Sequence, residues 1–478
     1  MVKDNSVRFG TLDQKVLDEL IDAVGTAAVS VEDEHRLAYG HDETEDLVMP
    51  PDVVVRPRST AEVAAVMRIC AQHRLPVTPI GGRTGLSGGA LCVHGGVGLA
   101  LDRMDSILEI DERNLQVTVE PGVITQVLHE AVAAKGMYYA PDPSSKGSCT
   151  IGGNLAENAG GPRAVKYGVT RDFVLNLEVV LPSGEVIWTG ANTLKNSTGY
   201  DLTRLIVGSE GTLGVITKAV LRLVPIPKET RLMLVPFRDP AKACEAVSAV
   251  FRAGVVPSAL EFMERDAIDW GLRFVPDITV PVADDTGAHL LIEVDGQHAD
   301  ALMRDCETIM NVMEAHECQD VLFAETTDQK NALWRLRRQV PEAVKGNSVY
   351  KEEDTVVPRY ELPRLLKGVK EVGARYGFKS VCYGHAGDGN LHVNIIKGDL
   401  SEEAWNTELP EAIREIFQLT VSLGGTLSGE HGIGLVQREY MDIAFSPIQL
   451  DLMQRLKEVF DPLGIMNPGK VFPASMRP

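Results

Sequence analysis

The stretch PVTPIGGRTGLSGGA, Pro76–Ala90, joins a short apolar run to a loop rich in glycine. Val77–Ile80 has the length and composition of a buried strand. Because glycine has no Cβ, backbone N–H groups in the loop that follows can approach a bound phosphate closely. The stretch therefore predicts a strand that ends in an anion-binding loop, as in a site for a nucleotide-like cofactor.

A second glycine-rich stretch, TIGGNLAENAGG, occupies Thr150–Gly161. Neither stretch contains the G-x-G-x-x-G pattern of a Rossmann site or the G-x-x-x-x-G-K-[ST] pattern of a P-loop. One such loop alone would be explained as a simple connection between strands. Two of them favour a nucleotide-like cofactor bound in some other fold.

The sequence around these loops reads as strands and helices in close succession. PDVVVRP, residues 51–57, predicts a strand, and Ser59 followed by Glu62 predicts a capping box that opens a helix. After about residues 221–229 the pattern changes to long amphipathic helices that alternate with strands, and we place a domain boundary there. No periodic repeat is visible along the chain.

Composition and charge limit the classes of protein that fit. The 478 residues correspond to two or three domains at about 150 residues each. A net charge of −20 argues against nucleic acid and anionic membranes as partners, and no apolar run reaches the ~20 residues of a membrane span. The seven cysteines form no Cys-x-x-Cys pair, and the start of the sequence shows no signal-peptide pattern, so we expect a cytoplasmic protein with reduced thiols.

The segment SVCYGHAGDGNLHVNII, residues 380–396, brings two histidines into one predicted hairpin. In a strand from Asn390 to Ile396, alternation puts His392 and Asn394 on one face. A hairpin would return that face beside His385. Two imidazoles so placed would form half of a metal site.

The segment GEHGIG, residues 429–434, offers a carboxylate and a third imidazole in a flexible loop. Glu430 would complete a His₂Glu set with an open position, which is typical of catalytic metals, and His431 would be left to act as a base. A lone histidine is more often a hydrogen-bonded core or turn residue, but this grouping favours a site. We expect zinc first, with iron, manganese and cobalt as alternatives.

The two glycine-rich stretches, together with LIVGSEGTLGVIT at residues 205–217, resemble the FAD domain of the vanillyl-alcohol oxidase, or PCMH-type, flavoproteins. The likeness is greatest to the group that contains the D subunit of glycolate oxidase, D-lactate dehydrogenase and D-2-hydroxyglutarate dehydrogenase, and extends from about Asp42 to Phe472. It implies an α+β fold with a two-part PCMH-type FAD-binding domain, an α+β (ferredoxin-like) substrate or cap domain, and a small helical C-terminal part. The corresponding ranges are 1–47 for a helical lead-in, 48–227 for the FAD domain, 228–420 for the cap domain with the metal hairpin, and 421–478 for the C-terminal segment.

The resemblance also implies which residues contact FAD. They are Pro79, Ile80, Gly81, Gly82, Arg83, Thr84, Gly85, Leu86, Ser87, Pro141, Asp142, Gly152, Gly153, Asn154, Asn158, Glu210, Val215, Ile216 and Asn467. Some relatives tether the flavin through a histidine in the first loop or through a cysteine. The first loop has no histidine here and Cys149 is the nearby thiol, so we expect FAD to be bound non-covalently.

The motifs H-A-G-D-G-N-x-H and G-E-H-G-I-G look like those that carry the metal ligands and the base in these dehydrogenases. The resemblance places substrate-carboxylate contacts at Arg337 and Lys351, and we expect Asn394 to orient the substrate. An arginine can bind a carboxylate with two hydrogen bonds. The alternative for Arg337 and Lys351 is a solvated helix face.

These features together predict a FAD- and metal-dependent dehydrogenase that oxidises a D-2-hydroxy acid, D-lactate first and glycolate second, to the 2-oxo acid. Expected partners are that small acid and an electron acceptor, either a quinone or an electron-transfer flavoprotein. Any contact with a membrane would come through the acceptor. A homodimer is also expected. The alternatives are a D-2-hydroxyglutarate dehydrogenase, a non-redox FAD transferase, a metallohydrolase and a non-catalytic flavin-binding protein. The helical H-E-x-x-H pattern of zinc peptidases is missing from the sequence.

Overall fold

The computed structural model describes residues 9–44, 47–278, 280 and 282–476, and its chain divides into two compact units. Unit 1 comprises Met1–Ala159, Val169–Ile226 and Glu430–Pro478, and unit 2 comprises Gly160–Gly168 and Pro227–Gly429. The short segment 160–168 interrupts the cofactor part of the sequence, and no sequence pattern predicted that it belongs to unit 2. Residues 1–8 and 45–46 of the predicted N-terminal lead-in lie outside the described residues.

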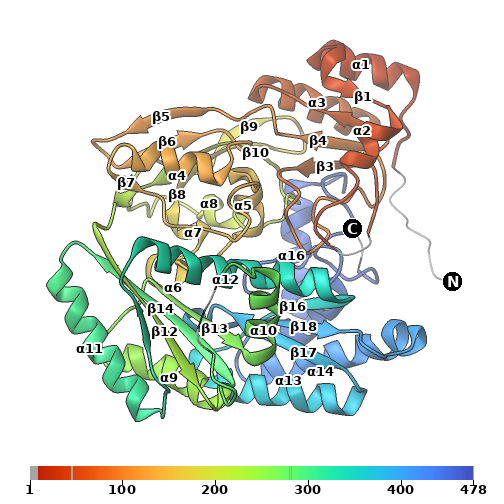
Figure 1. Cartoon of the computed structure of the whole chain (residues 1–478). Helices are drawn as coiled ribbons and strands as arrows, with labels where there is room; N and C mark the ends of the chain where they lie inside the picture. The colour runs from red at the N-terminus through yellow and green to blue at the C-terminus, as the bar shows by residue number, and fades with distance from the viewer. Residues whose placement is uncertain (1–8, 45–46, 279, 281, 477–478) are drawn as a thin grey trace. The chain divides into compact units, whose positions relative to one another are not determined.

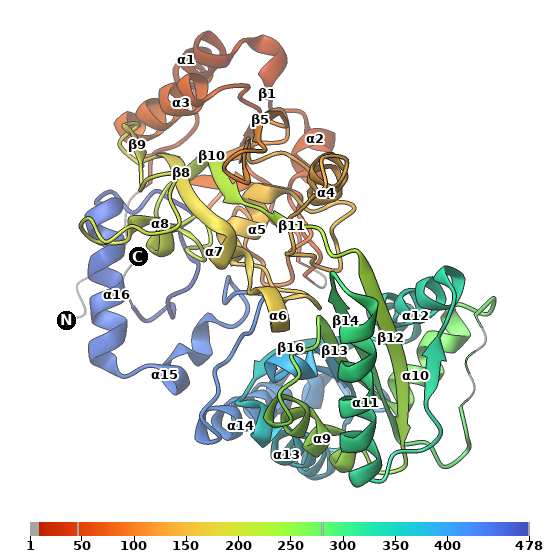
Figure 2. The same ribbon diagram turned by 90° about the vertical axis from the view of Figure 1, so that its left-hand side faces the viewer.

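The first sheet of unit 1 has the order β1-β2-β4-β3. Its strands are β1 (Val29–Ser30), β2 (Val53–Val55), β3 (Val77–Ile80) and β4 (Val97–Ala100). β4 runs parallel to both β2 and β3, and helix α3 (Thr60–His73) follows β2. Helix α1 (Gln14–Val24) lies beside α3, where Val16 and Leu20 enter the same apolar core (Figures 1 and 2).

The predicted capping box at α3 is only half formed. The Ser59 hydroxyl accepts a hydrogen bond from the Glu62 N–H, as expected. The Glu62 carboxylate accepts from the N–H of Arg58 rather than from that of Ser59. The helix start was therefore predicted correctly, while one of its two capping contacts was not.

The second sheet of unit 1 is antiparallel, in the order β5-β6-β10-β8-β9, and a separate pair is formed by β7 and β11. These strands are β5 (Ile107–Asp111), β6 (Gln116–Val119), β7 (Met137–Tyr138), β8 (Val174–Val180), β9 (Val186–Trp188), β10 (Val215–Arg222) and β11 (Val224–Pro225). Further helices are α2 (Asp33–Ala38), α4 (Thr125–Ala133), α5 (Ile151–Glu157), α7 (Thr170–Phe173), α8 (Leu202–Ile206), α15 (Met441–Ala444) and α16 (Pro447–Phe460). No helix among the described residues combines the length and the apolar character needed to cross a bilayer.

Unit 2 is built on one antiparallel sheet in the order β15-β12-β14-β13-β17-β18-β16. Its elements are α6 (Ala164–Tyr167), β12 (Glu229–Phe237), α9 (Pro240–Arg252), β13 (Ala259–Glu264), α10 (Arg265–Phe274), β14 (Ala288–Gly296), α11 (Ala299–Ala315), β15 (Leu322–Ala324), α12 (Thr327–Asn347), β16 (Tyr350–Val356), α13 (Leu362–Tyr376), β17 (Lys379–Gly384), β18 (Asn390–Ile396) and α14 (Leu409–Ser422). In Figure 1, α10 and α12 cover one face of the sheet and α9, α13 and α14 the other. The order β15-β12-β14-β13, formed by a β-α-β-β-α-β run, is the ferredoxin-like arrangement.

The second half of this sheet repeats the first half. Along the chain, β16, α13, β17 and β18 come in the same order as β12, α9, β13 and β14. The two halves of the sheet meet where β13 pairs with β17. β15 pairs with β12 in the first half, and Thr426 forms an antiparallel bridge to Val356 of β16 at the matching place in the second. The chain after α14 therefore takes the position of a fourth strand, and it leads directly to Gly429 and the end of unit 2.

Candidate active site

The two glycine-rich stretches of unit 1 pack directly on each other. A Cβ on Gly81 would lie 2.9 Å from Oγ1 of Thr150, and one on Gly82 would lie 2.7 Å from the carbonyl oxygen of Ser148. A Cβ on Gly152, in the first turn of α5, would lie 2.7 Å from Cβ of Pro121. Glycine is favoured at these positions because a threonine hydroxyl, a backbone carbonyl or a proline ring occupies the space of a side chain.

The first loop is held by its carbonyl groups, so its N–H groups stay available. Gly85 O accepts from the N–H of Glu43 at 3.0 Å, and Ser87 O accepts from that of Leu435 at 2.8 Å. Within the described chain, no backbone N–H from Gly81 to Ser87 donates a hydrogen bond, and the buried Ser87 Oγ has no partner. Arg83 adopts a φ of 58°, which turns successive N–H groups toward one side. These free donors fit a bound pyrophosphate, so the residues present suit FAD.

Two other predicted cofactor residues, Glu210 and Asn467, lie beside this loop but use their side chains within the protein. The Asn467 amide donates to the carbonyl groups of Glu210 and Gly89. The Glu210 carboxylate accepts from two N–H groups of the loop that follows His431. A Cβ on Gly211, the residue after Glu210, would lie 3.3 Å from the ring of Pro79, so the predicted residues Glu210 and Pro79 are near neighbours.

The remaining predicted cofactor residues are on the surrounding elements. Asn154 donates to Oγ1 of Thr125, and Asn158 accepts from the N–H of Arg171. Pro141, Asp142, Gly153, Val215 and Ile216 lie in the loop before α5, in α5 itself and at the start of β10. The buried thiol of Cys149 lies 3.2 Å from Oγ1 of Thr125.

Unit 1 also contains a buried group of acids next to the glycine loops. Burial, followed by repulsion from Glu210 and Asp42, raises the pKa of Glu157 well above its usual value. Burial also raises the pKa of Glu210, although its two N–H donors oppose the shift. Burial lowers the pKa of Lys470 to about 8, which limits the positive charge available to balance these acids. We therefore expect Glu157 to keep its proton to a higher pH in the folded protein than in the unfolded chain.

Replacing Glu157 with glutamine should raise the melting temperature, and by more at about pH 8 than at about pH 5. The folded-state pKa of Glu157 lies above its unfolded value, so the wild-type folded state loses stability as pH rises from the unfolded pKa toward the folded one. Glutamine resembles the protonated acid and removes that loss. Thermal unfolding of both proteins across this pH range would measure the effect. Equal melting temperatures at every pH would show that Glu157 ionises normally.

In unit 2 the predicted histidine hairpin is confirmed. β17 and β18 pair so that Tyr383 lies opposite His392, and β18 has the bounds Asn390–Ile396 that alternation predicted. The rings of His385 and His392 lie edge to face with centroids 5.5 Å apart, and a nitrogen of one ring lies within 4.8 Å of a nitrogen of the other. Both side chains are buried.

Each of these imidazoles has a carboxylate beside its Nδ1. His385 Nδ1 lies 2.9 Å from both oxygens of Glu261, a fully buried residue of β13. His392 Nδ1 lies 3.1 Å from Glu352 of β16. The hydrogen bond to Glu261 fixes the proton of His385 on Nδ1 and leaves its Nε2 as the ligand atom. The donor set therefore fits a divalent metal.

The charge of Glu261 is balanced by Arg337 of α12, whose Nη2 lies 2.8 Å from the carboxylate. Burial alone would raise the pKa of Glu261, but His385 and Arg337 outweigh it and hold that pKa below its usual value. Arg337 is only 3% exposed, and its guanidinium lies over the ring of Tyr383. Its Nε has no hydrogen-bond partner within the described chain, so a donor remains for a substrate.

Asn394 lies on the same sheet face as His392, but Lys351 does not. Lys351 pairs with Ile395 in the β16–β18 register, so alternation directs both to the opposite face. The Lys351 ammonium lies 5.5 Å from the ring centre of Trp405 there. The structure therefore does not bring Lys351 to the histidines as the sequence led us to expect, because residues 350–356 form a strand whose side chains alternate.

The remaining predicted residues, Glu430 and His431, follow the end of unit 2 in the chain. Glu430 is bonded to Gly429, whose N–H is held by Asp354 of β16. His431 is half-buried in unit 1, two residues before an N–H that donates to Glu210. A Cβ on Gly432 would lie 2.2 Å from Oε2 of Glu157 and 3.1 Å from the carboxylate of Glu210, so this loop packs on the buried acids.

Sequence reasoning missed the carboxylates that surround the histidines, namely Glu261, Glu352 and Asp354. A signal was present for the first of them, because a lone acid inside the apolar stretch ALEFM, residues 259–263, indicates a buried and paired charge. The other two belong to the charged run KEED, residues 351–354, whose strand conformation we did not predict.

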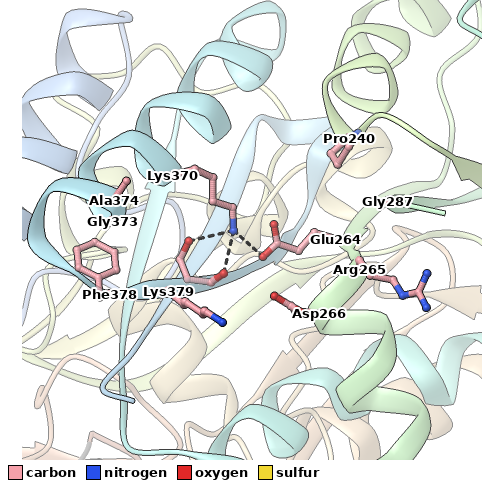
Figure 3. Close-up of a pocket in the computed structure, with 11 residues that line it drawn as sticks. Pro240, Glu264, Arg265, Asp266, Gly287, Lys370, Gly373, Ala374, Phe378 and Lys379 are labelled. Carbon is pink, nitrogen blue, oxygen red and sulfur yellow. Dashed lines mark hydrogen bonds and ion pairs between the residues drawn. The ribbon is translucent and has the colours of Figure 1, made fainter. Parts of the chain in front are cut away.

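Unit 2 also contains a pocket of about 520 Å³ on the other face of its sheet (Figure 3). Lys370 points into it, and its ammonium donates to Glu264 and to the carbonyl and hydroxyl oxygens of Ser380 at 2.8–3.0 Å. All three of its hydrogens are therefore used within the wall. The pocket is separated from the histidines by the sheet and offers them no ligand.

Comparisons with known proteins agree with this architecture. Residues 51–190 match the FAD binding domain family, and residues 226–471 match the C-terminal domain family of FAD linked oxidases. The p-cresol methylhydroxylase structure superimposes with a TM-score of 0.79 at 18% identity, covering 97% of each chain, which shows the fold alone. The predicted α+β fold of the PCMH type is thereby confirmed.

Relatives at higher identity span almost the whole chain. Glycolate oxidase subunit GlcD of Bacillus subtilis is 39% identical, with 97% of each chain covered. D-lactate dehydrogenase of Anaerostipes hadrus is 38% identical over 96% of this chain and 98% of the relative. D-2-hydroxyglutarate dehydrogenase of Stutzerimonas stutzeri is 33% identical over 97% of this chain and all of the relative. The chain therefore belongs to the family of FAD-linked oxidases and is a FAD-binding oxidoreductase.

Proposed function

We propose that the protein oxidises a D-2-hydroxy acid, D-lactate before glycolate, to the corresponding 2-oxo acid. The observation that carries the proposal is the pair of buried imidazoles, His385 and His392, each with a carboxylate at Nδ1. An enzyme that needed only a flavin would not require two oriented ligands of this kind. The names of the relatives, which include glycolate, D-lactate and D-2-hydroxyglutarate enzymes, agree with an acid of this class.

His385, His392 and Glu430 would hold a divalent ion, zinc first, and Gly81–Ser87 would hold the FAD pyrophosphate non-covalently. The metal would supply polarisation of the substrate hydroxyl, and FAD would supply the acceptor of the hydride. His431 would remove the hydroxyl proton. Positioned bases of this kind contribute about 10²- to 10⁴-fold to a rate.

The substrate carboxylate would be oriented by Arg337, which combines a fixed guanidinium plane with an unused Nε–H. Asn394, on the same sheet face as His392, would help to orient the substrate. Since Lys351 faces Trp405, the proposed site is made without it. The electrons would then pass to a quinone or an electron-transfer flavoprotein.

The rival functions receive less support. A metallohydrolase would have no use for the glycine loops, and the chain belongs to an oxidase family. An alkyldihydroxyacetonephosphate synthase shares the fold with a TM-score of 0.73, but at 18% identity it says nothing about the reaction. D-2-hydroxyglutarate remains the alternative substrate, because it shares the same head group with D-lactate.

Anaerobic titration of the purified, FAD-loaded protein tests the proposal. D-lactate should bleach the visible flavin absorption at the lowest concentration, glycolate should follow, and L-lactate should leave the spectrum unchanged. Metal analysis of the same sample should give about one ion per chain. D-2-hydroxyglutarate should be included in the series as the alternative substrate.

Two results would contradict the proposal. Bleaching by none of the 2-hydroxy acids would exclude the substrate class. Full bleaching by D-lactate in a protein stripped of metal by a chelator would exclude the role given to the histidine pair. Preference for D-2-hydroxyglutarate would retain the class and correct the substrate.

A further inference from the structure

Asp354 of β16 holds the last residues of unit 2. Its carboxylate, which is fully buried, accepts from the Ser428 hydroxyl at 2.9 Å and from the Gly429 N–H at 2.8 Å. The Asn390 amide donates to it at 2.6 Å. A Cβ on Gly429 would lie 2.7 Å from that amide, so glycine is required there. Asp354 therefore fixes the start of the G-E-H-G-I-G motif against the end of the H-A-G-D-G-N-x-H hairpin.

Glu210 of unit 1 holds the other end of the same motif. One carboxylate oxygen accepts from the Ile433 N–H at 2.8 Å, and the other accepts from the Gly434 N–H at 2.6 Å. Glu210 is only 7% exposed, and its own φ of 52° places it in the left-handed region. A backbone held in that region indicates that the surrounding structure enforces the position of this side chain.

We propose that Asp354 and Glu210 are positioning residues that fix the two ends of the loop carrying Glu430 and His431. Three residues, 430–432, lie between the two anchored segments, so Glu430 directly follows one anchored N–H and His431 lies two residues before the next. The roles of Glu430 and His431 rest on the function proposed above, whereas the anchoring rests on the hydrogen bonds alone. Carboxylates that accept two N–H or O–H donors make strong hydrogen bonds, which suits this task.

Hydrogen exchange of the full-length, FAD-loaded protein, read by mass spectrometry on peptides covering residues 425–436, tests the anchoring. Asp354→Asn should speed exchange at Gly429, and Glu210→Gln should speed it at Ile433 and Gly434, each by about tenfold or more. Ser428→Ala removes one donor without changing a buried charge and should give a smaller increase near Gly429, of about threefold. This variant keeps the test usable if Asp354→Asn fails to fold.

Glu264→Gln and Glu178→Gln are the matched controls, because each removes a buried, bonded carboxylate from a strand of the same unit. They should leave exchange in residues 425–436 unchanged. Unchanged exchange in Asp354→Asn, Ser428→Ala and Glu210→Gln would overturn the proposal, and so would an equal increase in the controls. Loss of FAD from Glu210→Gln would show that this residue serves the cofactor and would overturn its part.

Turnover separates positioning from general stability. The kcat of both anchor variants should fall about tenfold or more, with bound FAD retained, while the controls lose melting temperature but keep kcat. Exchange is measured without substrate, so it does not depend on the proposed function. A protein that oxidises no 2-hydroxy acid would contradict that function, and the exchange result would still test whether Asp354 and Glu210 anchor the loop. Faster loop exchange with full kcat would overturn the positioning role.

Discussion

Replacing His431 with asparagine should abolish turnover of the 2-hydroxy acid while FAD remains bound. Asparagine fills a similar volume and keeps hydrogen-bonding capacity, but it cannot accept a proton near neutral pH. We expect kcat to fall by about 10²- to 10⁴-fold, the range for loss of a positioned base. Steady-state assays of the variant, with the flavin spectrum recorded on the same sample, would measure both effects.

His73→Asn is the matched control for this variant. His73 lies on α3 and pairs with Glu19 of α1 at 2.7 Å, within unit 1 but on elements that carry no predicted site residue. The His73→Asn variant should have a lower free energy of unfolding than the wild type and an unchanged kcat. Wild-type turnover in His431→Asn would refute the proton-accepting role, and loss of FAD from it would show that the side chain supports the cofactor instead.

Local patterns in the sequence were sufficient to predict the parts of the site that depend on adjacent residues. Glycine runs predicted loops in which a Cβ has no room, as the contacts at Gly81 and Gly82 show, and phosphate binding by Gly81–Ser87 stays a prediction. Strict alternation predicted that His392 and Asn394 share a face, because alternation follows directly from strand geometry. The short turn of the hairpin then places the ring of His385 close to that of His392.

Features that depend on distant parts of the chain could not be predicted in this way. Glu261 reaches His385 from a strand more than a hundred residues earlier, and the pairing of β13 with β17 that makes this contact leaves no local pattern. Lys351 was assigned to the site from the family resemblance, and its place in the strand register, which directs it to the opposite face from His392, was not predicted. The segment 160–168 belongs to unit 2 through ion pairs of Arg163 with Glu293 and of Lys166 with Asp295, which likewise join distant residues.

Replacing His392 with alanine should remove the metal as well as the activity. In the proposed site this imidazole is one of three ligands, and a site left with one imidazole and one carboxylate binds a divalent ion much more weakly. Truncation also leaves the Glu352 carboxylate, 3.1 Å from Nδ1 in the wild type, without its imidazole partner. Metal analysis after dialysis should therefore give far less than one ion per chain, and kcat should fall by at least about 10³-fold, since metal polarisation and substrate orientation are lost together.

His289→Ala provides the comparison that separates ligand loss from cavity formation. His289 is a fully buried residue of β14 in the same sheet, and neither of its ring nitrogens has a hydrogen-bond partner within the described chain. Both truncations leave a cavity of the same size class and should lower the free energy of unfolding by about 2–4 kcal/mol. Only His392→Ala should lose metal, because His289 belongs to no group of three potential ligands among the described residues. Full metal content in His392→Ala, or equal metal loss in the two variants, would mean that the imidazole pair does not bind the ion.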